Sequence, residues 1–251
     1  MDKRIGAQYY TIRKFCENIE DFDKSCKKVA EIGYKIIQLS GTGDFEAHEI
    51  KPILDKYGLE VVCTHRPGDN YLNNLDEEIA FHKSLGAKIC GIGNMPDFNV
   101  KPETIEKFVK NFSPVADKLK ENDLIFAYHN HAFEFQKYDG KYAFDIITEA
   151  CENLKVILDV YWVAYAGIDP AKFIKERADK IACVHFKDLK IVDNAHSYAE
   201  IGQGNLEWDE IISACEEAGI EYALVEQDFC EGDPFDSLKI SYDYLKQKGF
   251  C

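Results

Sequence analysis

Three features are missing from the 251-residue sequence: a C-x-x-C pair, an apolar run long enough to cross a bilayer, and an excess of basic residues. The nine cysteines are scattered, which argues against a disulfide framework or a zinc ribbon and favours a reducing compartment. A membrane span needs ~20 consecutive apolar residues, so no membrane partner is expected. The net charge of −15 argues against a nucleic-acid partner, because neutralising phosphates requires clustered Lys and Arg.

The remaining composition is typical of a globular protein, with 46% hydrophobic and 30% charged residues. The first ten residues, MDKRIGAQYY, lack the apolar stretch of a signal peptide, so we expect a cytoplasmic protein. Cys63, Cys90 and Cys183 lie inside apolar runs, where small buried thiols are expected. The sequence does not determine whether the protein forms a homo-oligomer.

Short apolar runs alternate with segments of helical periodicity along the whole chain. The runs predict strands at residues 5–9, 35–39, 60–64, 88–92, 124–129, 155–160, 181–186 and 221–226. The periodic segments predict helices at residues 21–32, 46–57, 75–85, 103–122, 144–153, 170–178, 206–218 and 236–248. Four helices end in a glycine close to the next strand, as repeated βα units do (Gly33, Gly58, Gly86 and Gly219).

This alternation predicts an α/β protein with a single (β/α)8 TIM-barrel domain over residues 1–251, a fold of about 250 residues. A doubly wound sheet is the structural alternative. A dinucleotide-binding sheet would carry G-x-G-x-x-G after its first strand, whereas this chain has QYYTIRKF there. The sequence therefore favours the barrel.

In a barrel the active site lies at the carboxyl ends of the strands. The last four predicted strands end in, or are followed by, one strong ligand each: Glu134, Asp159, His185 and Glu226. This mixture of carboxylate and imidazole donors suits Mn²⁺, Mg²⁺, Co²⁺ or Zn²⁺. Taken singly, each has an ordinary explanation, such as a satisfied buried carboxylate, a core histidine or, for Glu134, a solvated loop acid. Their equivalent positions favour a shared metal site.

Further polar and aromatic residues lie near the same strand ends and are candidates for binding substrate: Gln38, His65, His129, His131, Trp162 and Lys187. The three histidines could equally support the metal ligands or simply end strands. Trp162 could form an apolar wall for a sugar ring or pack in the core. A long polar loop is expected at residues 187–205, and its segment 190–204 could cover the site, with Gly202 and Gly204 allowing a bend or a backbone contact to phosphate.

Five segments in order, AYHNHAFEF, LDVYWVAYAG, VHFKD, IGQGNLEW and LVEQD, resemble the sugar phosphate isomerase/epimerase superfamily, the xylose isomerase-like TIM barrels. The resemblance runs from GAQYYTIR to SYDYLK, almost the whole chain. It implies that Glu134, Asp159, His185 and Glu226 hold a divalent metal. It also implies that Glu134 and Glu226 transfer the proton while the metal, as a Lewis acid, stabilises the enediolate.

The resemblance implies a metal-dependent isomerase or epimerase of a small keto-sugar, a sugar phosphate or a cyclitol. An inosose-type dehydratase with the same site is the second hypothesis, and a non-catalytic sugar-binding barrel is the third. The HNH that precedes Glu134 departs from the characterised ketose epimerases, so the substrate is not carried over. Repair enzymes of the superfamily use additional histidines, and the acidic charge and seven histidines argue against that role here.

Overall fold

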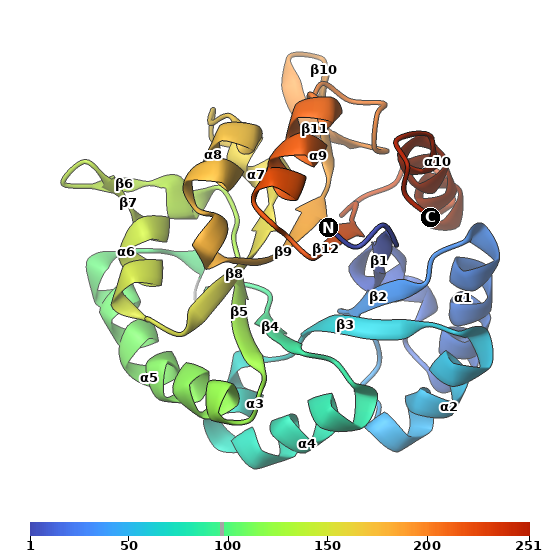
Figure 1. The fold of residues 1–251 in the computed structure, drawn as a ribbon, viewed down its shortest axis with the longest axis horizontal. Helices are drawn as coiled ribbons and strands as arrows, with labels where there is room; N and C mark the ends of the chain where they lie inside the picture. Colours follow the sequence, from blue (N-terminus) through green and yellow to red (C-terminus); the bar gives the residue numbers. More distant parts are fainter. Residues whose placement is uncertain (96–97) are drawn as a thin grey trace.

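Eight parallel strands close into a barrel in the computed structural model, which describes residues 1–95 and 98–251 (Figure 1). In order around the barrel, the strands are β1 (Gly6–Gln8), β2 (Ile36–Leu39), β3 (Glu60–His65), β4 (Ile89–Ile92), β5 (Ile125–His129), β8 (Leu154–Asp159), β9 (Ile181–Phe186) and β12 (Tyr222–Val225). Strand β12 pairs with β1 and closes the sheet. Because neighbouring strands are parallel, all their carboxyl ends lie at one end of the barrel.

Helices on the outside of the barrel connect the strands (Figure 1). They are α1 (Ile19–Ile32), α2 (Ala47–Tyr57), α3 (Gly68–Asn73), α4 (Leu75–Leu85), α5 (Pro102–Glu121), α6 (Ala143–Ala150), α7 (Val160–Tyr165), α8 (Pro170–Glu176), α9 (Trp208–Glu217) and α10 (Pro234–Gln247). Short 3-10 turns form η1 (Tyr9–Phe15), η3 (Phe133–Phe135) and η4 (Ala178–Lys180). The predicted (β/α)8 architecture is confirmed.

The predicted strands and helices match the observed ones to within a few residues at each end. All four predicted stop glycines have positive φ, between 65° and 129°, a conformation that glycine adopts without strain. Cys63, Cys90 and Cys183 are fully buried, as predicted. The loop expected between β4 and α5 includes residues 96 and 97, which lie outside the described residues.

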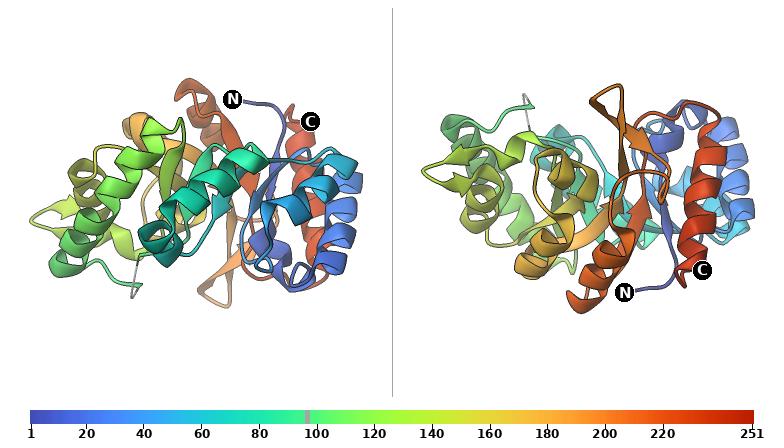
Figure 2. Two further views of the ribbon diagram at one scale, coloured as in Figure 1. Left: turned by 90° about the horizontal axis from the view of Figure 1, so that it is seen from below. Right: turned by 90° about the horizontal axis from the view of Figure 1, so that it is seen from above.

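The prediction of a long polar loop after β9 is wrong, because most of this segment forms an antiparallel hairpin. Strands β10 (Asp188–Val192) and β11 (Ala195–Ala199) pair from Asp188–Ala199 to Val192–Ala195. Asp193 and Asn194 make the turn with φ of 46° and 65°, the geometry of a tight two-residue hairpin turn. The hairpin projects from the end of the barrel opposite the two chain termini (Figure 2). A smaller hairpin joins β6 (Lys137–Tyr138) and β7 (Lys141–Tyr142).

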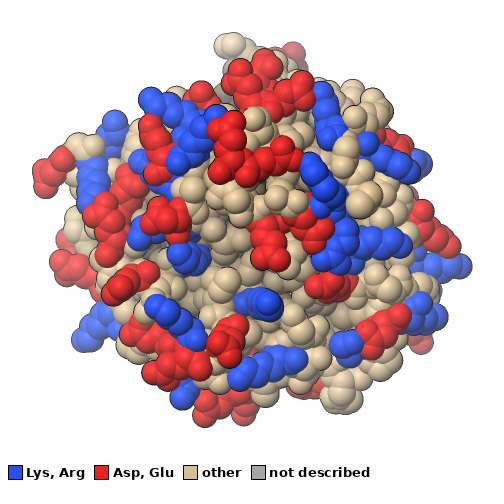
Figure 3. Space-filling model, in the orientation of Figure 1, with Lys and Arg blue, Asp and Glu red and all other residues tan. Residues whose placement is uncertain are grey.

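Apolar side chains from the strands fill the barrel interior. One buried cluster joins residues of seven strands: Ile36, Val62, Cys63, Ile89, Ala127, Ile157, Cys183 and Leu224. Among the described helices, none is long and apolar enough to cross a membrane. Acidic and basic side chains lie side by side on the face shown in Figure 3. Exposed ion pairs contribute at most about 1 kcal/mol each, so the core rather than surface charge stabilises the fold.

Candidate metal centre and substrate cavity

Four buried side chains meet where β5, β8, β9 and β12 end. His129 and Asp159 are the last residues of β5 and β8, His185 lies near the end of β9, and Glu226 follows β12. One ligand atom from each lies within 4.8 Å of the other three. The structure therefore brings together three of the predicted metal ligands, Asp159, His185 and Glu226, and adds His129 rather than Glu134.

Hydrogen bonds behind the two imidazoles fix which ring nitrogen faces the cluster. His129 Nδ1 lies 3.1 Å from the carbonyl oxygen of Gly93, and His185 Nε2 lies 2.7 Å from Gln38 Oε1. Each of these nitrogens can donate to its oxygen, which leaves a lone pair on His185 Nδ1, whereas His129 Nε2 lies 3.4 Å from Asp159 Oδ2 and pairs with that carboxylate. Such bonds orient metal-binding histidines in proteins. Gln38 supports His185 through this bond, and its contact with substrate stays a prediction.

The two carboxylates also keep one oxygen each for the cluster. Asp159 Oδ1 accepts a hydrogen bond from the backbone N–H of Tyr161 (2.9 Å), and Glu226 Oε1 accepts one from Gln8 Nε2 (3.4 Å). His185 Nδ1 and Glu226 Oε2 are only 2.8 Å apart, yet neither has a hydrogen-bond partner among the described residues. Two unpartnered lone-pair atoms that converge in this way suit a shared cation, so the residues fit a divalent metal.

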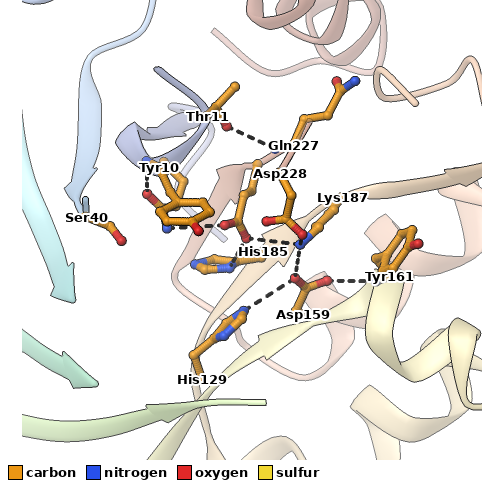
Figure 4. Close-up of polar contacts among 12 residues, drawn as sticks. Tyr10, Thr11, Ser40, His129, Asp159, Tyr161, His185, Lys187, Gln227 and Asp228 are labelled. Carbon is orange, nitrogen blue, oxygen red and sulfur yellow. Dashed lines mark hydrogen bonds and ion pairs between the residues drawn. The ribbon is translucent and has the colours of Figure 1, made fainter. Parts of the chain in front are cut away.

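Lys187 adds a positive charge to the same cluster (Figure 4). Its Nζ lies 2.8 Å from Asp228 Oδ2, 3.2 Å from Asp159 Oδ2 and 3.8 Å from Glu226 Oε2. The side chain is 1% exposed, so its charge is compensated by these carboxylates rather than by water. Lys187 thus holds the carboxylates of the candidate metal centre, and its contact with substrate stays a prediction.

Burial and charge act in opposite directions on the acidic members of the cluster. Burial raises the pKa of Glu226, but attraction to nearby cations, Lys187 above all, outweighs it and holds the pKa well below its usual value. The pKa of Asp159 is lowered in the same way, because Lys187 and His129 outweigh its burial. Burial lowers the pKa of Lys187, yet its carboxylate partners raise it overall. Both carboxylates are therefore ionised at neutral pH and available as ligands.

Glu134 lies in η3, beyond the end of β5, and is not among the four residues whose ligand atoms form the cluster. Tyr128 Oη donates to Oε1, and the backbone N–H of His131 donates to Oε2 at 2.8 Å. The side chain is fully buried and is not among the residues that line the substrate cavity. Burial raises the pKa of Glu134 to about 7, although its two hydrogen bonds oppose the shift. These two hydrogen bonds tie Glu134 to the loop after β5, and its role in metal binding and proton transfer stays a prediction.

A cavity of about 670 Å³ opens beside the cluster at the carboxyl ends of the strands. Of the predicted substrate-binding residues, His65, His129 and His131 line it, whereas Gln38, Trp162 and Lys187 do not. His65 Nε2, His131 Nδ1 and Trp162 Nε1 are buried without a hydrogen-bond partner in the part of the chain that is described. Buried polar atoms of this kind are available for the hydroxyl groups of a ligand. The cavity volume suits a small molecule.

Sequence reasoning did not assign roles to several residues that support the cluster. Asp228 pairs with Lys187, Gln8 donates to Glu226, and Asn130 Oδ1 accepts from the backbone N–H of Asp159 at 3.0 Å. All three lie just past or at the end of a strand. Their position near strand ends was the available signal, but polar residues there are too common for single ones to be assigned a role from sequence.

The family model for xylose isomerase-like TIM barrels matches residues 26–248. The chain belongs to this family. Among curated proteins, an inosose dehydratase of Mesomycoplasma hyopneumoniae is 23% identical over 67% of this chain and 63% of its own length. The rhizopine catabolism protein MocC of Rhizobium meliloti is 21% identical over 67% of this chain and 58% of its own length. The matched region thus spans less than two thirds of these relatives.

Solved structures of the family share the fold. A sugar phosphate isomerase/epimerase from Parabacteroides distasonis superposes with a TM-score of 0.79, covering 97% of this chain and 93% of its own. The two sequences are 19% identical, so this similarity supports the fold alone. The proteins similar to this barrel thus include one named a sugar phosphate isomerase/epimerase and one named an inosose dehydratase.

Proposed function

We propose that this xylose isomerase-like barrel is a divalent-metal-dependent isomerase or epimerase of a small polyhydroxylated ketone, a keto-sugar or a cyclitol. The observation that carries the proposal is the convergence of four buried ligand atoms, from His129, Asp159, His185 and Glu226, beside a cavity at the carboxyl ends of the strands. A divalent cation held there would act as a Lewis acid toward a carbonyl and a neighbouring hydroxyl oxygen.

Glu226 is the group placed to move the proton. It reaches both the ligand cluster and the cavity, and its lowered pKa keeps it ionised and able to accept a proton from the carbon beside a carbonyl. Gln8 fixes one carboxylate oxygen through its hydrogen bond, which orients the other toward the cluster.

An epimerase needs a second group on the opposite face of the substrate carbon. Glu134 is the residue that the family resemblance suggests for this step, but its carboxylate is buried and hydrogen-bonded outside the cavity lining. His65 and His131 line the cavity and each offers an unpartnered ring nitrogen. Burial lowers the pKa of both imidazoles, so each is neutral at rest, and we assign to one of them the relay of a proton from solvent to the substrate carbon.

Dehydration of an inosose-type substrate is the second candidate, favoured by the curated inosose dehydratase relative. The same carboxylate, Glu226, would remove the proton, and an imidazole of the cavity, neutral at rest, would pass a proton from solvent to the departing hydroxyl group. Dehydration differs from epimerisation only in whether water leaves before the proton returns, so one experiment separates the two.

The test is incorporation of solvent deuterium into a panel of ketoses and inososes by the Mn²⁺-loaded protein, followed by NMR. Incorporation without loss of water supports an isomerase or epimerase, and release of water supports the dehydratase. Binding without exchange would leave only a sugar-binding barrel. Glu226→Gln is expected to slow exchange by about 10²-fold or more, the usual contribution of a general base. Glu231→Gln, an exposed acid of the same loop paired with Lys190, is the matched control.

A further inference from the structure

We propose that the substrate of this site carries no phosphate, because carboxylates of the chain itself occupy the positions where this fold binds phosphate. The conclusion about the substrate rests on the proposed function. The observation that carboxylates fill these phosphate-binding positions does not. In (β/α)8 barrels a phosphate is frequently bound by the loops after the seventh and eighth strands, at a helix N-terminus. Here these are the loops after β9 and β12.

The loop after β9 closes around the buried carboxylate of Asp188. Backbone N–H groups of Gly202 (2.9 Å), Gly204 (3.1 Å) and Leu206 (3.3 Å) donate to it, as does the Trp208 indole N–H (2.7 Å). A Cβ atom on Gly204 would lie 2.3 Å from Asp188 Oδ1, so this close approach of the backbone requires glycine. A backbone contact to phosphate was one of the two roles predicted for Gly202 and Gly204. Their N–H groups instead bind an anion of the chain itself, the Asp188 carboxylate.

The loop after β12 is acidic along its length. Residues 226–233 carry four carboxylates in the sequence EQDFCEGD. Asp228 is paired with Lys187 at 2.8 Å, and Asp233 caps α10 by accepting a hydrogen bond from the backbone N–H of Phe235 at 2.9 Å. The N-terminus of α10, where the helix dipole would favour a bound anion, is thus already supplied with a negative charge.

Cations near the cavity are likewise committed to partners. The Arg66 guanidinium donates to Glu78 at 3.0 to 3.2 Å and lies against the Phe81 ring. Arg13 donates to the backbone carbonyl oxygens of Tyr10 and Asp228. Lys187 is held by the carboxylates of the metal centre.

The described lining of the cavity consequently carries more negative than positive charge. It contains the carboxylates Asp44, Glu226 and Asp228 and one guanidinium, Arg66. A phosphate ester would meet like charges there, and apart from the proposed metal the described lining offers no unpaired side-chain cation to compensate them. Aromatic rings of Tyr10, Phe45, Phe81 and Phe98 also line the cavity and suit the apolar face of a sugar ring. These features select an uncharged polyol.

The first test compares each free ketose with its phosphate ester, D-fructose with D-fructose 6-phosphate and D-ribulose with D-ribulose 5-phosphate. Deuterium exchange by the Mn²⁺-loaded wild-type protein is expected to have a kcat/KM about a hundredfold or more higher for the free sugar of a pair. A preference for the ester would overturn this inference and leave the proposed function standing. Exchange with none of the four would count against the proposed function for these sugars, and phosphate binding then decides the inference.

Inorganic phosphate tests the anion sites without turnover. We expect the Tm of the metal-free wild-type protein to be the same in phosphate and in chloride at equal ionic strength, and a saturable rise with phosphate would overturn the inference. Asp188→Ser frees the backbone N–H groups and is expected to gain a phosphate-dependent rise in Tm. If the variant folds but gains no such rise, the N–H groups around residue 188 are not an anion site. If Asp188→Ser does not fold, Asp233→Ser provides the same comparison at α10.

Discussion

Replacing Glu134 by glutamine tests whether this residue binds metal or holds the loop after β5. Glutamine keeps the size of the side chain and can accept from the backbone N–H of His131 while its NH₂ group donates to Tyr128 Oη. The loop geometry should therefore survive. What changes is the charge, because glutamine is neutral at every pH whereas the buried carboxylate has a pKa raised to about 7.

The raised pKa fixes both the sign and the size of the expected effect. The usual pKa is 4.5, so the folded protein binds the Glu134 proton more tightly than the unfolded chain does. Its contribution to stability is fully present below pH 4.5 and is lost as the pH rises to about 7. A shift of this size corresponds to about 3 kcal/mol. Relative to wild type, Glu134→Gln should become more stable by about that amount between pH 4.5 and pH 8.

The assay is the Tm of both proteins across this pH range, where about 3 kcal/mol corresponds to roughly 6–12 °C in a chain of this length. Glu149→Gln, an exposed acid paired with Lys141, is the control and should follow the wild-type curve. Mn²⁺ binding to Glu134→Gln is expected to be unchanged. A loss of about tenfold or more in Mn²⁺ affinity, as when a partner of a metal site is removed, would refute this reasoning and return Glu134 to the metal centre.

Further substitutions test the metal centre and the barrel interior. Saturating Mn²⁺, at about 100 times its Kd, should stabilise the wild-type protein by about 2.7 kcal/mol, which is measured as a rise in Tm. Asp159→Asn and His185→Asn should lose this rise. An unchanged rise in both variants would place the metal elsewhere. Lys187→Met leaves buried carboxylates uncompensated, so the free energy of unfolding of the metal-free variant, measured in urea, should fall by about 3–5 kcal/mol. Mn²⁺ should raise the free energy of unfolding more in this variant than in wild type. Equal gains would contradict a shared charge cluster. Gly91→Ala would place a Cβ 2.3 Å from the Thr64 carbonyl oxygen and should cost about 1–3 kcal/mol, whereas Gly232→Ala, with open space around it, should change Tm little.

The order of strands and helices was predictable from the sequence because each element carries its own local signal. Apolar runs of strand length, helical periodicity and stop glycines such as Gly58 and Gly86 depend only on neighbours along the chain. The β10–β11 hairpin also had such a signal, since Asp193 and Asn194 separate two short runs with strand character, and it was missed because the segment is polar.

The candidate site was only partly predictable. Asp159, His185 and Glu226 lie at or directly beside strand ends, and the regular parallel register of a barrel brings such positions together. His129 belongs to the same group because it is the last residue of β5 and pairs with Ile157 of β8. Glu134 lies five positions further on, in a 3-10 turn that directs its carboxylate toward Tyr128.

The sequence by itself determined the barrel and the set of chemical groups at its carboxyl end, because strand and helix preferences act over a few neighbouring residues. Only the tertiary structure decided which of these groups face one another. Lys187 enters the carboxylate cluster, and Asp188 points into the loop of Gly202 and Gly204. The two are adjacent in sequence, and alternation of side chains sends them to opposite sides of the backbone. Lys187 meets Asp159 and Glu226 because β8 and β12, which lead to these residues, lie on either side of β9 in the barrel.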